Sequence, residues 1–237
     1  MSTLTNSLAL VIGSGGGIGA AMLARLQTNP ASEKAIGLSR STEVSVDYAD
    51  ESSIAKAAQS IASLCAESNL QLRLLIVATG FLHGEQGQPE RSFTNLDAAY
   101  LDHVFKINTL GPALVMKHFL PLLPKTGRCV AGFISAKVGS ISDNALGGWY
   151  GYRASKAALN QLVKTAAVEL TRRNKESICV SLHPGTVATT LSEPFAKTGL
   201  NVRPASDAAN DLLTVLALLQ PVDSGCLVDY QGQKLPF

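Results

Sequence analysis

Near its N-terminus the chain carries the stretch Leu8-Ala9-Leu10-Val11-Ile12-Gly13-Ser14-Gly15-Gly16-Gly17-Ile18-Gly19. The apolar run predicts a buried strand, and the residues near 18–28 have the pattern of a helix. Glycines between a strand and a helix let the backbone approach a ligand closely, and the free N–H groups at a helix start attract phosphate. The stretch therefore predicts a strand, a turn and a helix that together bind a pyrophosphate. We assign the contacts to Gly13, Ser14, Gly17, Ile18 and Gly19.

The rest of the chain alternates between apolar runs and helical segments. Predicted strands lie at Leu8–Gly13, Lys34–Ser39, Val44–Asp47, Leu72–Thr79, Cys129–Ser135, Ile178–His183 and Cys226–Asp229. Predicted helices lie near 18–28, 50–68, 96–119, 152–172 and 205–219. Several strands are apolar without alternation, as in sheets covered on both faces. This order predicts one doubly wound α/β domain over residues 1–237, with a parallel sheet of about seven strands between two helix layers.

Composition limits the partners. Charged residues make up 16% of the chain and the net charge is +2, so neither nucleic acid nor an anionic membrane is expected as a partner. No run of about 18 apolar residues predicts a membrane span, and the first residues lack the pattern of a signal peptide. The four cysteines are scattered without metal spacing. We therefore expect a cytoplasmic protein with reduced thiols and no metal site.

A second ligand feature lies at the end of the second predicted strand, Gly37-Leu38-Ser39-Arg40-Ser41. In many dinucleotide-binding folds an acid about 20 residues after the glycines binds the ribose 2′-hydroxyl, and an arginine there accommodates a 2′-phosphate. Arg40 occupies this place, and a guanidinium fork matches phosphate geometry. We expect NADP rather than NAD. The alternative is that Arg40 is solvated surface and Glu43 binds the ribose.

Tyr152 and Lys156 open a helical segment, and their spacing of four puts both side chains on one face. A free tyrosine has a pKa of about 10. Lowering that pKa by about 3 units takes about 4 kcal/mol, which a cation about 4 Å away supplies at an effective dielectric of about 20. The pair therefore predicts acid–base chemistry by Tyr152, although the same spacing also occurs on ordinary helix surfaces.

Together, the Gly13-x-x-x-Gly17-x-Gly19 turn and the Tyr152-x-x-x-Lys156 pair resemble the short-chain dehydrogenase/reductase family, over essentially the whole chain. The stretch Gly139–Asn160 and the ending Asp229–Phe237 resemble its C-factor-like branch, which includes carbonyl reductases and proteins linked to intercellular signalling. The resemblance implies a Rossmann-type fold and a carbonyl–alcohol redox step with NAD(P)H on a small-molecule substrate. It also implies a homodimer or homotetramer.

The resemblance implies roles for individual residues. Tyr152 gives a proton to the developing alkoxide, and Lys156 lowers the pKa of Tyr152 and binds the cofactor ribose. Asn108 helps to hold a proton-relay water, with a satisfied core amide as the alternative. The family's Asn-Asn-Ala-Gly element is Val77-Ala78-Thr79-Gly80 here, so the glycine is kept and the two amides that support that strand are replaced. The remaining cofactor contacts fall on Asp47, Tyr48, Gly80, Pro184, Gly185, Val187 and Thr189.

The carbonyl-binding serine is the weak point of the resemblance. With Gly139 as the anchor, the family's serine falls on Ala136, between Ser135 and the more distant Ser140. We expect Ser135 to polarise the carbonyl, with Ser140 as the second choice and no serine as the third. The displaced serine also supports a rival function, a cofactor-binding signalling or scaffold protein with little turnover.

The residues near 185–204 have the weakest pattern and predict a loop over the site. We interpret His183, just before this loop, as a strand-end residue rather than an acid–base group, because Tyr152 already fills that role. Candidates for an apolar pocket wall are Phe81, Trp149, Leu191 and Phe195.

Overall fold

The computed structural model describes residues 6–28, 33–189, 191, 194 and 202–237. Seven strands form one sheet in the order β2-β1-β3-β4-β5-β6-β7. Their bounds are β1 (Ser7–Ile12), β2 (Lys34–Leu38), β3 (Gln71–Val77), β4 (Cys129–Ile134), β5 (Ser177–His183), β6 (Leu227–Asp229) and β7 (Lys234–Leu235). All neighbouring pairs are parallel except β6 and β7, which are antiparallel. The doubly wound α/β fold is confirmed.

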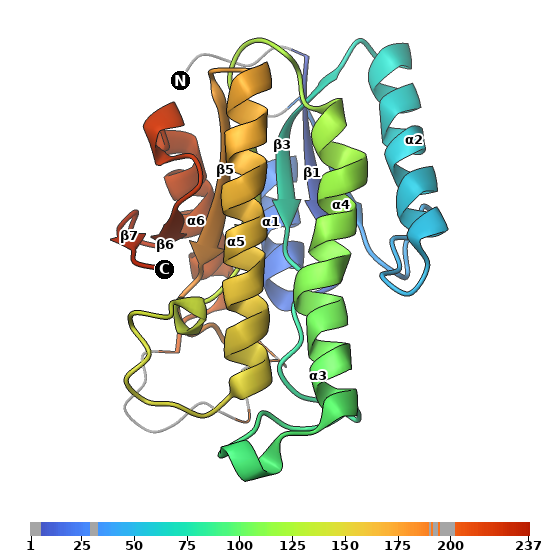
Figure 1. Ribbon diagram of the computed structural model, residues 1–237. Coiled ribbons are helices and arrows are strands. Elements are labelled where there is room, and N and C mark those ends of the chain that lie inside the picture. The colour runs from blue at the N-terminus through green and yellow to red at the C-terminus, as the bar shows by residue number, and fades with distance from the viewer. Residues whose placement is uncertain (1–5, 29–32, 190, 192–193, 195–201) are drawn as a thin grey trace.

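Helices cover both faces of the sheet (Figure 1). One face carries α2 (Glu51–Glu67), α3 (Ala98–Phe105), α4 (Gly111–Phe119) and α5 (Tyr150–Arg173), and the other carries α1 (Gly17–Gln27) and α6 (Ala205–Leu218). A π-helix, η2 (Lys106–Leu110), joins α3 to α4, and the 3-10 turns are η1 (Phe93–Asn95), η3 (Leu120–Leu122), η4 (Lys137–Gly139) and η6 (Pro221–Asp223).

The central strands are mostly apolar on both faces because each helix layer closes its own core. In β1, Leu8 and Leu10 pack into the core under α2, α4 and α5, whereas Ala9 and Val11 pack into the core under α1 and α6. Successive side chains of a strand point to opposite faces, so burial on both faces removes the usual polar alternation.

The predicted strand Val44–Asp47 is wrong. This segment has no ladder partner, and its polar backbone groups are satisfied locally. The Val46 N–H donates to the Ser39 carbonyl at 3.0 Å, and the Thr42 hydroxyl donates to the Val44 carbonyl at 2.8 Å. The apolar side chains at 44 and 46 pack against the core from a loop. The seventh strand is instead β7, whose two residues carry no periodic signal.

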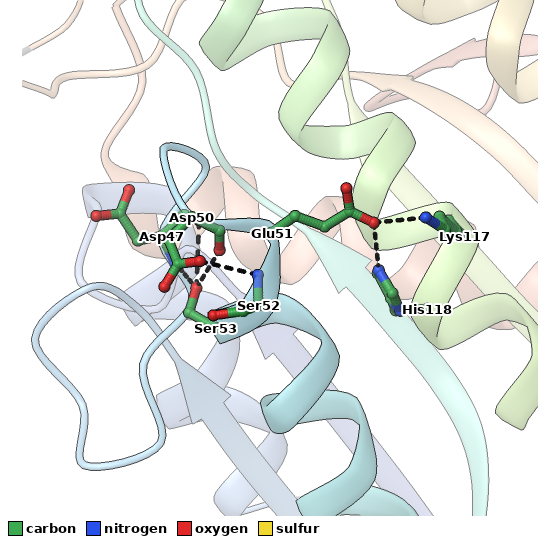
Figure 2. Close-up of polar contacts among 7 residues, drawn as sticks. All are labelled: Asp47, Asp50, Glu51, Ser52, Ser53, Lys117 and His118. Carbon is green, nitrogen blue, oxygen red and sulfur yellow. Dashed lines mark hydrogen bonds and ion pairs between the residues drawn. The ribbon is translucent and has the colours of Figure 1, made fainter.

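The loop from 39 to 50 leads into α2 through polar contacts (Figure 2). The Asp50 carboxylate caps the helix by accepting a hydrogen bond from the Ser52 N–H at 2.9 Å. Glu51 reaches across to α4, where it pairs with Lys117 at 2.6 Å and His118 at 2.9 Å. These contacts join α2 to α4 on one side of the sheet.

No helix in the described part of the chain is long and apolar enough to cross a membrane. All four cysteines are free thiols, with Cys129 and Cys179 buried and the other two half-buried. Among the described residues, no group of three or more histidine, cysteine or acidic side chains lies close enough together to hold a metal.

Candidate active site

A cavity of about 330 Å³ opens at the carboxyl ends of β1, β3, β4 and β5. The chain runs from β1 to β2 on one side of β1 and then crosses to β3 on the other side of β1. The cavity therefore lies where the strand order reverses, which is where doubly wound sheets bind ligands. Its described lining comprises Gly16–Ile18, Ala78–Gly80, Leu82, Ile134–Val138, Trp149, Tyr152, Lys156, His183–Val187, Thr189 and Leu191.

The glycine turn forms one end of this cavity. Gly13 has a φ of +87°, which favours glycine, and a Cβ at Gly19 would lie 2.2 Å from the Gly13 carbonyl oxygen. Gly16 precedes α1, and no side chain among the described residues caps that helix. The first turn of α1 also carries no acidic residue. The uncapped N–H groups and the helix dipole fit the pyrophosphate of a dinucleotide.

The contacts expected for the adenosine half lie beyond the turn. Arg40 and Glu43 are both exposed after β2, and the Asp47 carboxylate accepts a hydrogen bond from the Ala49 N–H at 2.8 Å. Tyr48 is buried, and its hydroxyl lies 2.9 Å from the Thr79 hydroxyl. Burial raises the pKa of Tyr48. The Tyr48–Thr79 pair also supports the end of β3, where the two amides of the family are missing.

Tyr152 and Lys156 line the cavity from the first turns of α5, and both are buried. Lys156 Nζ lies 5.9 Å from the centre of the Tyr152 ring and donates to the Ile134 carbonyl at 2.9 Å. Burial raises the pKa of Tyr152 to about 12 and lowers that of Lys156 to about 7. In the protein by itself the pKa of Tyr152 is therefore raised, not lowered as predicted, because burial disfavours the charged phenolate.

Asn108 lies in η2 and is fully buried. Its Oδ1 accepts from the Phe81 N–H at 2.8 Å, and its Nδ2 donates to the Phe81 carbonyl at 2.8 Å and to Ser155 Oγ at 3.1 Å. A Cβ at Gly80 would lie 3.6 Å from Lys156 Nζ and 3.8 Å from Asn108 Oδ1. The amine and the amide therefore face the same place beside the cavity.

The two candidate serines differ in position. Ser135 lines the cavity, and its hydroxyl donates to Asn160 Oδ1 at 2.7 Å. Ser140 is buried after η4, where its Oγ accepts from the Asp143 N–H at 3.2 Å. The structure thus brings Ser135, and not Ser140, into the wall that contains Tyr152. The sequence did not predict Asn160 as the partner of Ser135, although it lies four positions after Lys156 on the same helix face.

The segment after β5 closes the other side. Pro184, Gly185, Val187 and Thr189 line the cavity, and a Cβ at Gly17 would lie 2.8 Å from Thr189 Cγ2. Of the four proposed pocket-wall residues, Trp149 and Leu191 line the cavity, Phe81 packs beside it against His103, and Phe195 lies outside the described residues. Half of the predicted loop near 185–204 also lies outside them.

A sequence profile described as short chain dehydrogenase matches residues 7–199, and the chain belongs to this family, whose members use NAD(P). Among curated proteins it is 36% identical to C-signal of Myxococcus xanthus over 143 residues, which cover 60% of this chain and 82% of that protein. It is also 36% identical to 1-hydroxy-2-glutathionyl-2-methyl-3-butene dehydrogenase of Rhodococcus sp. (strain AD45), over 55% of this chain. That match spans only 56% of the dehydrogenase.

Solved structures agree on the fold. The carbonyl reductase Sniffer of D. melanogaster superposes with a TM-score of 0.84 at 23% identity, over 98% of this chain and 99% of that one. The NADPH-bound carbonyl reductase from chicken fatty liver gives a TM-score of 0.82 at 25% identity, with the same coverage. The profile match makes the chain a member of an oxidoreductase family that acts on CH–OH or C=O groups of small molecules.

Proposed function

We propose that this protein reduces a carbonyl compound to an alcohol with NADPH. The observation that carries the proposal is the placement of Tyr152 and Lys156, two buried polar side chains, in the wall of the cavity that begins at the glycine turn. The carbonyl reductases with the same fold and the dehydrogenase from Rhodococcus support the same class of reaction.

Side chains of the protein would supply the proton that the reduction consumes. NADPH, when bound, supplies the hydride. Tyr152, with a pKa of about 12, carries its proton at neutral pH, which is the state that reduction requires. Tyr152 gives this proton to the alkoxide oxygen, and Lys156 stands next to it to bind the ribose and take part in reprotonation. Asn108 orients the Phe81 backbone beside this pair and supports the relay.

Ser135 remains our proposed partner of the carbonyl oxygen. A serine hydroxyl has a single proton, which Ser135 directs at Asn160 Oδ1. The Asn160 Nδ2 has no partner among the described residues. If the side-chain amide of Asn160 is flipped by about 180°, so that its oxygen and nitrogen exchange places, Nδ2 donates to Ser135 Oγ instead. That orientation pairs the amide and leaves the serine proton for the substrate.

The test is turnover of aldehydes, ketones and quinones with NADPH by wild-type protein and by Tyr152→Phe. We expect the variant to lose on the order of 10²–10⁴-fold in kcat. Tyr150→Phe is the matched control, because Tyr150 begins the same helix but does not line the cavity. Equal activity of Tyr152→Phe and wild type would contradict the proposal.

The preference for NADPH rests on Arg40, which is exposed at the end of β2 with no acid beside it in the turn. A lower KM for NADPH than for NADH is expected, and a clear preference for NADH would overturn this assignment.

A second candidate function is a cofactor-binding signalling protein with little turnover. It is favoured by the similarity to C-signal and by Ala136 in the family's serine position. Tight NADPH binding without turnover above that of Tyr152→Phe would support this candidate instead.

We also propose a homodimer or homotetramer. Large apolar side chains are exposed on the α3–α5 layer, among them Leu110 in η2 and Val168 in α5. Light scattering at micromolar concentration is expected to give at least twice the 24.8 kDa mass of the chain, and a monomer mass would contradict this assembly.

A further inference from the structure

Two polar side chains lie on the cavity wall after β4 and β5. Lys137 belongs to η4 and His183 ends β5, and both line the cavity that contains Tyr152. Among the described lining residues, the only other side chain that can carry a positive charge is Lys156, and none is a carboxylate. The function proposed above uses neither Lys137 nor His183.

The His183 ring has unused hydrogen-bonding capacity. Its Nδ1 is buried and has no partner among the residues that the structure describes. Burial lowers the pKa of His183 to about 4, so the ring is neutral at physiological pH and offers one N–H donor and one lone pair. A buried polar atom without a partner costs free energy, which a polar group on a ligand would recover.

The Lys137 ammonium group is available to form an ion pair with a ligand. Its Nζ lies 3.4 Å from Asp143 Oδ1, and the two side chains are 48% and 41% exposed. An ion pair as exposed as this one contributes little to stability, so a ligand carboxylate can take the place of the Asp143 carboxylate at low cost.

Lys137 and His183 follow neighbouring strands, because Ile134 of β4 pairs with Leu182 of β5, and both side chains line the same cavity. The Lys137 charge contributes to the lowered pKa of His183, whereas Asp229 and Asp143 oppose it. Because both side chains line one cavity, an anionic group bound between them can meet the ammonium and the imidazole.

We propose that Lys137 and His183 form a subsite for a carboxylate on the substrate, so that the protein acts on aldehydes or ketones that bear an acid group. This inference rests on the proposed function, because the subsite shares its cavity with Tyr152. The carboxylate accepts a charge-assisted hydrogen bond from Lys137 and a second one from His183. Ala136, Val138 and Trp149 line the same cavity and suit the hydrocarbon part of such a substrate.

The experiment compares 4-formylbenzoate with its methyl ester as substrates with NADPH. For the wild type we expect kcat/KM to be about tenfold higher for the acid, or more, which corresponds to about 1.4 kcal/mol. Lys137→Met should remove this preference by raising KM for the acid and should leave the ester unchanged. Lys137→Arg should keep the preference for the acid.

Asp143→Asn should increase the preference for the acid, because the competing carboxylate is gone. His183→Phe should weaken it, and Lys175→Met, at an exposed position outside the cavity, should match the wild type.

Equal kcat/KM for acid and ester in the wild type would overturn the subsite, as would a Lys137→Met variant that slows both substrates alike. Reduction of the ester that depends on Tyr152 shows that the proposed function stands even then. Titration of the NADPH-bound protein with 4-(hydroxymethyl)benzoate tests the subsite without turnover. We expect binding that Lys137→Met weakens about tenfold, and no binding to the wild type would overturn the inference.

Discussion

At the scale of single residues, Lys156 is a buried amine whose charged form is disfavoured by its surroundings. It is 2% exposed, and burial lowers its pKa from 10.5 to about 7. Because the folded pKa lies below the unfolded one, the unfolded chain binds more protons between about pH 7 and pH 10.5. The free energy of unfolding therefore rises with pH across this window, and the full cost is present below it.

We predict that Lys156→Met raises the free energy of unfolding at pH 7 by about 2–4 kcal/mol and abolishes carbonyl reduction. Met keeps the volume and removes the charge, so the rise in stability between pH 7 and pH 10 should be smaller than in the wild type. Urea unfolding across this range measures both effects, with Lys125→Met as an exposed control. Identical pH dependence of Lys156→Met and wild type would contradict the prediction.

The residue scale also shows what the sequence could not predict. The spacing of four correctly placed Tyr152 and Lys156 side by side, because helix geometry is local. In the chain alone the pKa of Tyr152 is raised rather than lowered, because desolvation depends on everything packed around the pair. The Ser135–Asn160 hydrogen bond joins residues 25 positions apart, and no local pattern predicts such a contact.

At the scale of elements, η2 explains the position of Asn108. Pro112 has no N–H to donate to the carbonyl four residues earlier, which is that of Asn108 itself. The helix passes through π geometry at this point, and the Asn108 side chain pairs with the Phe81 backbone. The pair Gly111-Pro112 is typical of a helix irregularity, but it does not indicate the partner of the amide.

We predict that Asn108→Ala lowers the free energy of unfolding by about 1–3 kcal/mol, because it leaves both Phe81 backbone groups without the amide. It should also lower kcat, because the segment beside Gly80 loses its support. Urea unfolding and NADPH turnover measure the two effects. Asn210→Ala, on the exposed face of α6, is expected to change neither.

The N-terminus of α5 has a buried anion as its partner. Glu90 is buried, and both carboxylate oxygens lie 3.1 Å from the Gly151 N–H in the first turn. Such a carboxylate satisfies a free N–H group and complements the helix dipole. Glu90 therefore fixes the end of the helix that presents Tyr152.

We predict that Glu90→Ala lowers the free energy of unfolding by about 1–3 kcal/mol, since it removes a buried charge-assisted hydrogen bond. Glu90→Gln should lose less, because an amide oxygen still accepts from Gly151. Glu169→Ala, exposed later in α5, is the control. A loss no larger in Glu90→Ala than in the control would show that the carboxylate does not hold the helix.

At the scale of the whole molecule, the alternation of strands and helices predicted the layers of the fold well. Parallel strands linked by helices have their carboxyl ends at one edge, so the glycine turn, Gly80, Ser135 and His183 had to converge there. The sequence did not predict two short segments correctly. Val44–Asp47 is apolar enough for a strand but finds no neighbour, and β7 is too short to show a period. Whether such a short segment becomes a strand depends on hydrogen bonding to a neighbouring strand, and that neighbour is distant in the sequence.

Cofactor binding provides the test at this scale, because a ligand that binds only the folded chain stabilises all of it. At 100 times its Kd, NADPH should add about 2.7 kcal/mol, which raises Tm by about 5–10 °C for a chain of this size. NADH at the same concentration should give a clearly smaller shift, because only a 2′-phosphate engages Arg40. Arg40→Ala should reduce the NADPH shift to the size of the NADH shift, whereas Arg25→Ala, exposed near the end of α1, should leave it unchanged. This measurement needs no turnover, so it separates the choice of cofactor from the chemistry of Tyr152. A shift with NADH equal to that with NADPH would leave Arg40 as solvated surface.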